Sequence, residues 1–133
     1  MTKKVMVADD DFDNRTIAQE ALEAAGYDVV LATNGIEVME KISVENPAAL
    51  LLDLSMPKLN GWEVAKQIRL LPQHSGMAII AFTAHALMGD ELKAKASGCD
   101  DYISKPCLPK EVVEKVTSWI GRKTVIGQKN VAP

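Results

Sequence analysis

Ala49-Leu50-Leu51-Leu52-Asp53 is a run of four apolar residues that ends at a single carboxylate. Its apolar residues do not alternate with polar ones, and the same holds for residues 78–82, Ala-Ile-Ile-Ala-Phe. Strands of this kind are buried on both faces, which is typical of parallel sheets covered by helices on each side. The stretch therefore predicts a parallel β-sheet at the centre of the fold.

Short apolar runs alternate with longer segments of helical period along the whole chain. The predicted strands are 4–8, 29–31, 49–52, 78–82 and 101–104, and the predicted helices are 12–25, 36–44, 61–71, 86–97 and 110–120. Strict alternation indicates an α/β fold with helices on both faces of the sheet. We expect a flavodoxin-like, doubly wound sheet of five parallel strands in the order 2-1-3-4-5, with five helices.

The length of 133 residues is that of one domain, and the composition is ordinary for a globular protein. The net charge of -3 gives no reason to expect nucleic-acid binding. No apolar stretch approaches the ~18 residues that a membrane span needs, and the two cysteines fit no metal or disulfide pattern. We therefore expect a cytoplasmic protein with one domain, residues 1–121, and a flexible C-terminal tail, residues 122–133.

Four of the predicted strands end at polar residues suited to phosphate or a divalent metal. Asp9 and Asp10 follow the first strand, Asp53 the third, Thr83 the fourth, and Lys105 comes directly after the fifth. The carboxyl ends of parallel strands lie at one edge of the sheet, and the order 2-1-3-4-5 places its switch point between the first and third strands. We therefore expect three carboxylates, one hydroxyl and one ammonium in a single site.

The residue types at this edge indicate phosphoryl chemistry. Three carboxylates repel one another unless a cation compensates them, and Mg²⁺ suits oxygen ligands with room for water. With Mg²⁺ and Lys105 bound, the site is formally neutral, so Mg²⁺ is the predicted cofactor. Asp53 stands alone at the end of a buried strand and is the candidate nucleophile for an aspartyl phosphate. Asp11 is instead predicted to cap the first helix.

Five motifs in this order and spacing carry a resemblance to a known family. They are the acidic residues in 7–11, the stretch 52–57 around Asp53, Asn60-Gly61, residues 82–84, and residues 101–106. Over residues 3–120 the chain resembles the receiver domain of two-component response regulators, and it is most similar to the single-domain, chemotaxis-regulator-like type. Asn60 stands where aspartate is more usual, a departure that keeps the turn chemistry intact.

The resemblance implies a phosphorelay switch rather than an enzyme that acts on external substrates. Asp53 would accept a phosphoryl group from a sensor histidine kinase or a histidine phosphotransfer protein. Asp10, Asp53 and the backbone carbonyl of Ser55 would bind Mg²⁺, and Asp9 would hold metal-bound water. Lys105 would bind phosphoryl oxygens.

The resemblance also implies a conformational switch with a docking surface. Thr83 would bind the phosphoryl group and move toward it while Tyr102 turns inward, and the bond between Lys105 and Pro106 is expected to be cis. A downstream protein would bind over the fourth helix, the fifth strand and the fifth helix, from about residue 86 to residue 120.

Two alternatives remain open at the level of sequence. The chain could be a receiver cut from a hybrid kinase or a larger regulator, although the sequence ends at Pro133 without an output domain. It could also be a phosphatase of the haloacid dehalogenase type, which uses an aspartyl phosphate. That class needs a second aspartate two positions after the nucleophile, and Ser55 occupies this position.

Overall fold

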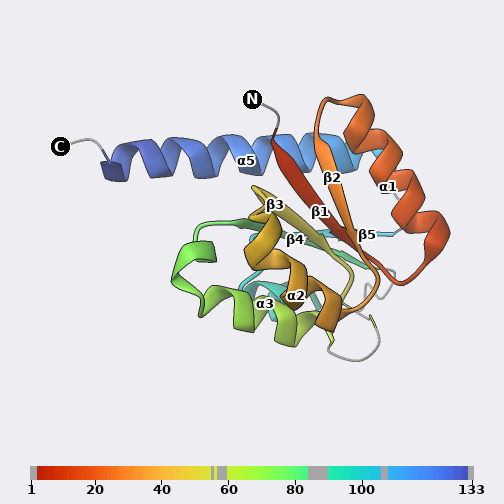
Figure 1. Cartoon of the computed structure of the whole chain (residues 1–133), viewed down its shortest axis with the longest axis horizontal. Helices are drawn as coiled ribbons and strands as arrows, with labels where there is room; N and C mark the ends of the chain where they lie inside the picture. Colours follow the sequence, from red (N-terminus) through yellow and green to blue (C-terminus); the bar gives the residue numbers. More distant parts are fainter. Residues whose placement is uncertain (1–2, 55, 57–59, 84–89, 106–107, 132–133) are drawn as a thin grey trace.

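The computed structural model describes residues 3–54, 56, 60–83, 90–105 and 108–131. Five parallel strands form one sheet in the order β2-β1-β3-β4-β5 (Figure 1). The strands are β1 (Lys4–Ala8), β2 (Asp28–Ala32), β3 (Ala49–Leu52), β4 (Ala78–Thr83) and β5 (Asp101–Ser104). The predicted doubly wound parallel sheet is therefore confirmed.

Helices cover both faces of this sheet (Figure 1). The helices are α1 (Phe12–Ala24), α2 (Gly35–Glu45), α3 (Gly61–Arg69), α4 (Asp90–Ala96) and α5 (Pro109–Val131), with the 3-10 turn η1 (Pro72–His74) before β4. α1 and α5 pack on one face, α2 and α3 pack on the other, and α4 lies against β5. Among the described residues, none of these helices combines the length and apolar character that a membrane span requires.

Alternate residues of the central strands point into two separate cores. Val7, Leu51 and Ile80 face α1 and α5, whereas Leu50 and Ile79 face α2 and α3. All five side chains are at most 1% exposed. Burying such a side chain contributes roughly 1.5–3 kcal/mol, so both faces stabilise the sheet. This two-sided burial explains why the strands show no polar alternation.

The ends of α1 follow the local chemistry of its sequence. The Asp11 carboxylate accepts hydrogen bonds from the backbone N–H groups of Asp13 (2.8 Å) and Asn14 (3.3 Å), which confirms the predicted cap. At the other end Gly26 has a φ of 98°, a left-handed conformation that favours glycine. Both ends of α1 are therefore fixed by local interactions. The loop that precedes α1, which contains Asp9 and Asp10, lies at the edge of the sheet.

The last two helices differ from their predicted bounds. α5 continues through Gly121, where the sequence predicted its end, to Val131. Glycine in a helix costs only about 1 kcal/mol, and the turn that follows is fastened to the rest of the domain. Lys123 pairs with Asp100 at 3.0 Å, and the Arg122 guanidinium lies 4.6 Å from the Trp119 ring centroid. The fourth helix is described from Asp90, and residues 86–89 of its predicted range lie outside the described residues.

Arg69, at the end of α3, joins the amino ends of β4 and β5. Its guanidinium donates hydrogen bonds to the carbonyl oxygens of Gly98 (2.7 Å), Ser75 (3.0 Å) and Met77 (2.7 Å), and to the Asp100 carboxylate (2.8 Å). The same carboxylate oxygen accepts a hydrogen bond from the Ile79 N–H at 2.9 Å. Three segments are thus fixed at the edge opposite the acidic residues.

Candidate functional site

The carboxyl ends of β1 and β3 bring three carboxylates together, as the sequence predicted. One oxygen from each of Asp9, Asp10 and Asp53 lies within 4.8 Å of the others. Asp9 and Asp53 are only 1% and 4% exposed, whereas Asp10 is exposed. The cluster therefore has a buried floor and one side open to solvent.

Hydrogen bonds that extend the sheet hold the backbone of this cluster. The N–H of Asp9 donates to the carbonyl oxygen of Ala32 at 3.1 Å, and the N–H of Asp53 donates to that of Ala8 at 2.9 Å. Each aspartate thus continues the strand before it by one residue. The two buried carboxylates are therefore carried by the sheet itself.

Lys105, directly after β5, reaches into the same cluster. Its Nζ lies 2.5 Å from Oδ2 of Asp9 and 3.4 Å from Oδ2 of Asp53, and the side chain is 9% exposed. The ammonium also lies 4.9 Å from the centroid of the Phe82 ring, within the range of a cation–π contact. One ammonium compensates one of the three carboxylates, so a negative charge of two remains for a further cation.

The electrostatics of Asp9 reflect this imbalance. Burial raises the pKa of Asp9 above its ordinary value, and the neighbouring Asp53 carboxylate adds to the effect. Hydrogen bonds from the Lys105 ammonium and from the Asp11 N–H (2.9 Å) oppose the shift without cancelling it. The charged form of this carboxylate is therefore disfavoured until more positive charge arrives.

Arg15 belongs to the site although the sequence analysis did not single it out. Its Nη1 donates a hydrogen bond of 2.9 Å to the backbone carbonyl oxygen of Asp9, and its guanidinium carbon lies 5.6 Å from the Phe12 ring centroid. A basic residue one turn into the helix that follows Asp9-Asp10 is the sequence signal that could have found it. The contact fixes the peptide unit that carries the Asp9 carboxylate.

The start of α3 lies unusually close to the backbone of the candidate acceptor. A Cβ atom on Gly61 would stand 2.5 Å from the Cα of Leu54 and 2.8 Å from the carbonyl oxygen of Asp53. Gly61 also donates a backbone hydrogen bond to the Leu54 carbonyl oxygen at 3.2 Å. Asn60 caps the helix by accepting from the Glu63 N–H at 3.1 Å, which aspartate would also do. Residue 61 must therefore be glycine for α3 to start this close to the backbone of Asp53 and Leu54.

The remaining predicted residues are described in part. Thr83 ends β4 opposite Ser104, and its side chain lies outside the described part of the structure, as do Ser55 and Pro106. Tyr102 is half-buried and packs against the core under α2 and α3. The structure therefore brings together Asp9, Asp10, Asp53 and Lys105, and it places Tyr102 one strand position beyond Asp101.

The donor set fits a magnesium ion. Mg²⁺ takes oxygen ligands in an octahedron with bonds of about 2.1 Å, so ligand atoms lie about 3.0 to 4.2 Å apart. The carboxylate oxygens of the cluster lie within 4.8 Å of one another, so they are close enough to bind one ion either directly or through a metal-bound water. The open side at Asp10 leaves room for the water and phosphate ligands that this ion keeps. The two uncompensated charges match its valence.

The family model of the response regulator receiver domain matches residues 5–117. The chain belongs to this family. The polar-differentiation response regulator DivK of Brucella ovis is 32% identical to the receiver domain over 121 residues, which are 91% of this chain and 98% of that protein. The whole length of a single-domain relative is thus matched.

Solved structures with the same fold support the assignment. A putative response regulator from Chloroflexus aurantiacus superposes with a TM-score of 0.87 at 27% identity, covering 91% of this chain and 99% of that one. A CheY-like receiver domain protein from Methanospirillum hungatei gives a TM-score of 0.86 at 27% identity, covering 93% and 98%.

Membership in the family supports several predictions at a general level. The chain is a phosphoryl acceptor of two-component signalling, and neither alternative from the sequence analysis is better supported. Receiver domains act as phosphoacceptor switches, bind Mg²⁺ at an acidic pocket, and interact with histidine kinases and downstream targets. The cluster of Asp9, Asp10 and Asp53 is the acidic pocket of this receiver domain.

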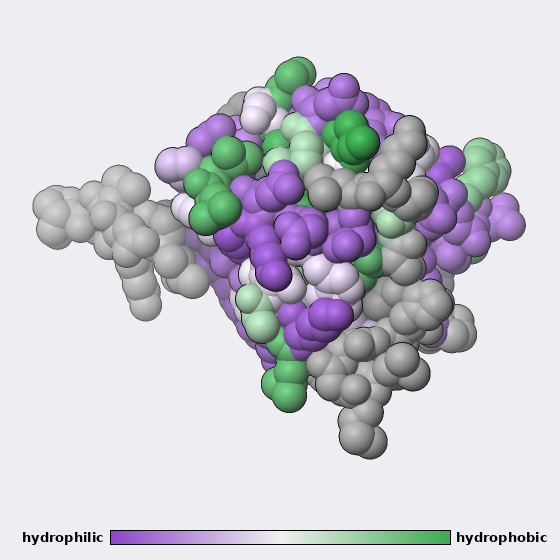
Figure 2. Space-filling view, turned by 90° about the horizontal axis from the view of Figure 1, so that it is seen from below, coloured by the Kyte–Doolittle hydropathy of each residue, from purple (hydrophilic) through white to green (hydrophobic). Residues whose placement is uncertain are grey.

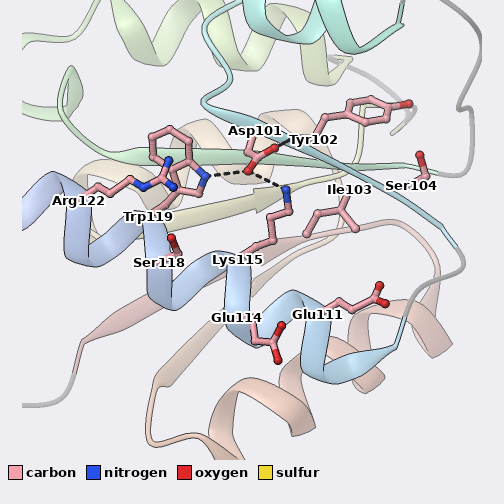
Figure 3. Close-up of a pocket in the computed structure, with 10 residues that line it drawn as sticks. All are labelled: Asp101, Tyr102, Ile103, Ser104, Glu111, Glu114, Lys115, Ser118, Trp119 and Arg122. Carbon is pink, nitrogen blue, oxygen red and sulfur yellow. Dashed lines mark hydrogen bonds and ion pairs between the residues drawn. The ribbon is translucent and has the colours of Figure 1, made fainter.

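A cavity of about 510 Å³ lies between β5 and α5 (Figure 3). Asp101 lines this cavity together with two side chains of α5 that bind its carboxylate. Oδ2 of Asp101 accepts hydrogen bonds from Lys115 Nζ at 2.9 Å and Trp119 Nε1 at 2.8 Å, and Oδ1 accepts one from the Tyr102 N–H at 2.8 Å. We call this arrangement the Asp101 clasp, because it fastens β5 to α5 beside Tyr102.

Replacing Asp101 by asparagine should destabilise the receiver domain in a pH-dependent way. Burial alone would raise the pKa of Asp101, but the hydrogen bonds from Trp119 and Lys115 outweigh it and lower the pKa below 3.8. The stabilisation is therefore present above pH 3.8 and lost as the pH falls through the lowered value. In urea unfolding we expect Asp101→Asn to cost about 1 to 2 kcal/mol at pH 7 and progressively less below pH 4.

The matched control is Glu111→Gln, which removes an exposed carboxylate of the same cavity. We expect it to leave the free energy of unfolding within about 0.5 kcal/mol of the wild type. An equal effect of both substitutions, or a pH-independent effect at Asp101, would contradict the role of the clasp.

Proposed function

We propose that Asp53 is the residue of this receiver domain that accepts the phosphoryl group, from a histidine kinase or a histidine phosphotransfer protein. The observation that carries the proposal is the placement of Asp53. It is the buried carboxylate at the end of the central strand β3, within 4.8 Å of two further carboxylates and 3.4 Å from Lys105. Asp9 is equally buried, but its Oδ2 is already held by Lys105 at 2.5 Å.

The transfer is a displacement at phosphorus. A carboxylate oxygen of Asp53 forms the new O–P bond while the N–P bond of the phosphohistidine donor breaks, and the imidazole leaves with the electron pair. Lys105 lies where it can hold a phosphoryl oxygen, and exchange of its contact with Asp9 for one with the phosphoryl group costs little movement. Thr83, at the end of the neighbouring strand β4, is the proposed hydroxyl donor.

Mg²⁺ would be held by Asp10, Asp53 and the backbone carbonyl of Ser55, with Asp9 holding a metal-bound water. When bound, the ion supplies positive charge that stabilises the phosphoryl oxygens during transfer. Arg15 supports this arrangement by keeping the Asp9 peptide unit in place. The acidic composition and the raised pKa of Asp9 support the assignment.

Phosphorylation would then act on partners through Thr83 and Tyr102. Tyr102 lies on β5 next to the Asp101 clasp. A movement of Tyr102 would therefore be transmitted through Asp101 to α5. We propose the surface of α4, β5 and α5 as the docking face for a downstream protein. We also propose that residues 1–121 are the receiver unit of a cytoplasmic protein, with residues 122–133 as a C-terminal tail into which α5 continues.

The direct test is incubation of the full chain with acetyl phosphate and Mg²⁺, followed by intact mass measurement. A phosphoryl group moves from acetyl phosphate to the protein and acetate leaves, so we expect a gain of about 80 Da. Absence of that gain at saturating acetyl phosphate would overturn the proposal.

Removal of the Asp9 carboxylate should weaken Mg²⁺ binding and strengthen the metal-free fold. Asp9→Asn removes one of three crowded negative charges, so we expect a higher melting temperature without Mg²⁺, by a few degrees. Mg²⁺ affinity, measured by calorimetry, should fall about 10- to 100-fold because the residue positions the bound ion and its water. Asp11→Asn is the control, since asparagine also caps helices and Asp11 faces the backbone of α1. Equal loss of affinity in both variants would contradict the assignment.

A further inference from the structure

On the face that carries α2 and α3, the exposed apolar side chains do not form one continuous patch (Figure 2). Figure 2 shows the face that carries α2 and α3, where hydrophobic residues are separated by hydrophilic ones. Val44 on α2, Leu70 after α3 and Leu92 on α4 are each exposed by more than 70%, but they belong to different elements. Single exposed apolar residues are normal on a surface. A hollow with a distinct charge pattern is therefore the better candidate for recognition.

The cavity between β5 and α5 has such a pattern along its length. Glu111 and Glu114 line one end, and Trp119 and Arg122 line the other (Figure 3). The two glutamates are three residues apart, so they are neighbours on the surface of α5. Both are exposed, and their carboxylates take part in no hydrogen bond or ion pair among the described residues, although the Glu111 backbone N–H donates to the Leu108 carbonyl oxygen at 2.9 Å. This end of the cavity therefore carries two uncompensated negative charges.

The cations of the cavity are engaged elsewhere. Lys115 lies between the glutamates and Trp119 on α5, and its Nζ is bound to Asp101 at 2.9 Å. Arg122 lies over the Trp119 ring at the far end. The Asp101 clasp thus engages the ammonium of Lys115, the lysine among the residues that line the cavity. The charge pattern is a consequence of how β5 is fastened to α5.

The Trp119 end of the cavity has an apolar part. Ile103 is 6% exposed and belongs to the core between the sheet and α5, and Trp119 packs partly against the same core. Trp119 is also among the residues that line the cavity. From Glu111 to Trp119 the helix rises about 12 Å, which equals roughly two turns.

We propose that this cavity recognises a basic amphipathic segment of the downstream protein. A Lys or Arg side chain of that segment would pair with Glu111 and Glu114, and an apolar side chain about two helical turns away would pack on Trp119. The match is one of charge complementarity: two free carboxylates beside an apolar surface select a positive charge beside an apolar residue. The inference rests on the proposed docking face and names the chemistry of its partner.

The test uses two probe peptides of about 16 residues composed of Ala, Leu and Lys, or of Ala, Leu and Glu, with Leu at helical spacing. Binding is followed by Trp119 fluorescence in the full chain with Trp62→Phe, so that one indole reports. We expect the Lys peptide to bind and the Glu peptide to bind at least about tenfold more weakly. In Glu111→Gln/Glu114→Gln the affinity for the Lys peptide should fall on the order of fivefold.

The control is Glu20→Gln/Glu23→Gln on α1, which removes the same charge from two exposed glutamates with the same spacing. It should change the affinity by less than about twofold. Equal weakening by both double substitutions would show non-specific attraction to an acidic protein and overturn the inference. So would equal binding of the two peptides, no binding of either, or light scattering that shows a dimer broken by the α5 substitutions.

Failure of this inference can be separated from failure of the proposed function. Affinities are measured for the chain before and after treatment with acetyl phosphate and Mg²⁺, and intact mass is recorded for each sample. If the chain gains the mass of one phosphoryl group but binds the Lys and Glu peptides equally, the docking inference is wrong and the proposed function stands. If the chain prefers the Lys peptide but gains no mass, the phosphoryl-acceptor proposal is wrong and the docking inference stands.

Discussion

Asp53→Asn should abolish phosphorylation of the chain by acetyl phosphate, with the rate of the mass gain of about 80 Da falling on the order of 100-fold or more. The asparagine keeps the shape of the side chain but loses the anionic oxygen that forms the O–P bond. The wild-type carboxylate is 4% exposed and 3.4 Å from Lys105, surroundings that differ from those of an acidic side chain on the exposed surface of α1.

The control for this variant is Asp13→Asn, which removes an exposed carboxylate from the first turn of α1. It should phosphorylate at the wild-type rate. Asp53→Asn should remain folded, because it relieves repulsion with Asp9 and Asp10, and its melting temperature without Mg²⁺ should not fall. A phosphorylated Asp53→Asn chain with wild-type kinetics would show that another residue accepts the group.

Gly61→Ala should be the most destabilising small substitution near the site. The new Cβ would stand 2.5 Å from the Cα of Leu54 and 2.8 Å from the carbonyl oxygen of Asp53, and both neighbours are backbone atoms that cannot turn aside. Relief of the clash requires α3 to move away from the end of β3. We expect a loss of about 2 to 3 kcal/mol in urea unfolding, together with slower phosphorylation, because the Asp53 backbone must shift.

Gly76→Ala provides the matched comparison, since a Cβ at that position meets no atom within 4 Å and the backbone is not left-handed. Its free energy of unfolding should stay within about 0.5 kcal/mol of the wild type or rise slightly. Similar losses at both positions would mean that the close approach of α3 to Asp53 is not what requires glycine.

The pattern of buried strands was enough to predict the topology. Unalternating apolar runs such as residues 49–52 and 78–82 require helices on both faces, and alternation of strand and helix leaves few orders for the sheet. Helix ends were predicted where a side chain acts locally, as at Asp11. The end of α5 was not, because the contact of Lys123 with Asp100 is a tertiary interaction across 23 residues of sequence.

The acidic pocket was predictable for the same reason, since residues directly after parallel strands must meet at one edge. Arg15 and the Asp101 clasp were not. Arg15 acts through a backbone carbonyl, so its position one turn into the helix after Asp9-Asp10 is a sequence signal that does not name its partner. The clasp joins Asp101 to Lys115 and Trp119, each of which alone is typical of an ordinary surface helix.

Arg69 anchors β4 and β5 at one edge of the sheet, at their amino ends. It fixes the carbonyls of Ser75, Met77 and Gly98 at the amino ends of β4 and β5, while the other ends of these strands carry Thr83 and Lys105. β4 is also paired with β3 and β5 along its length. We therefore expect phosphoryl chemistry at the carboxyl ends of β4 and β5 to displace these ends more than the amino ends that Arg69 anchors, so the response would be directional rather than a general loosening of the fold.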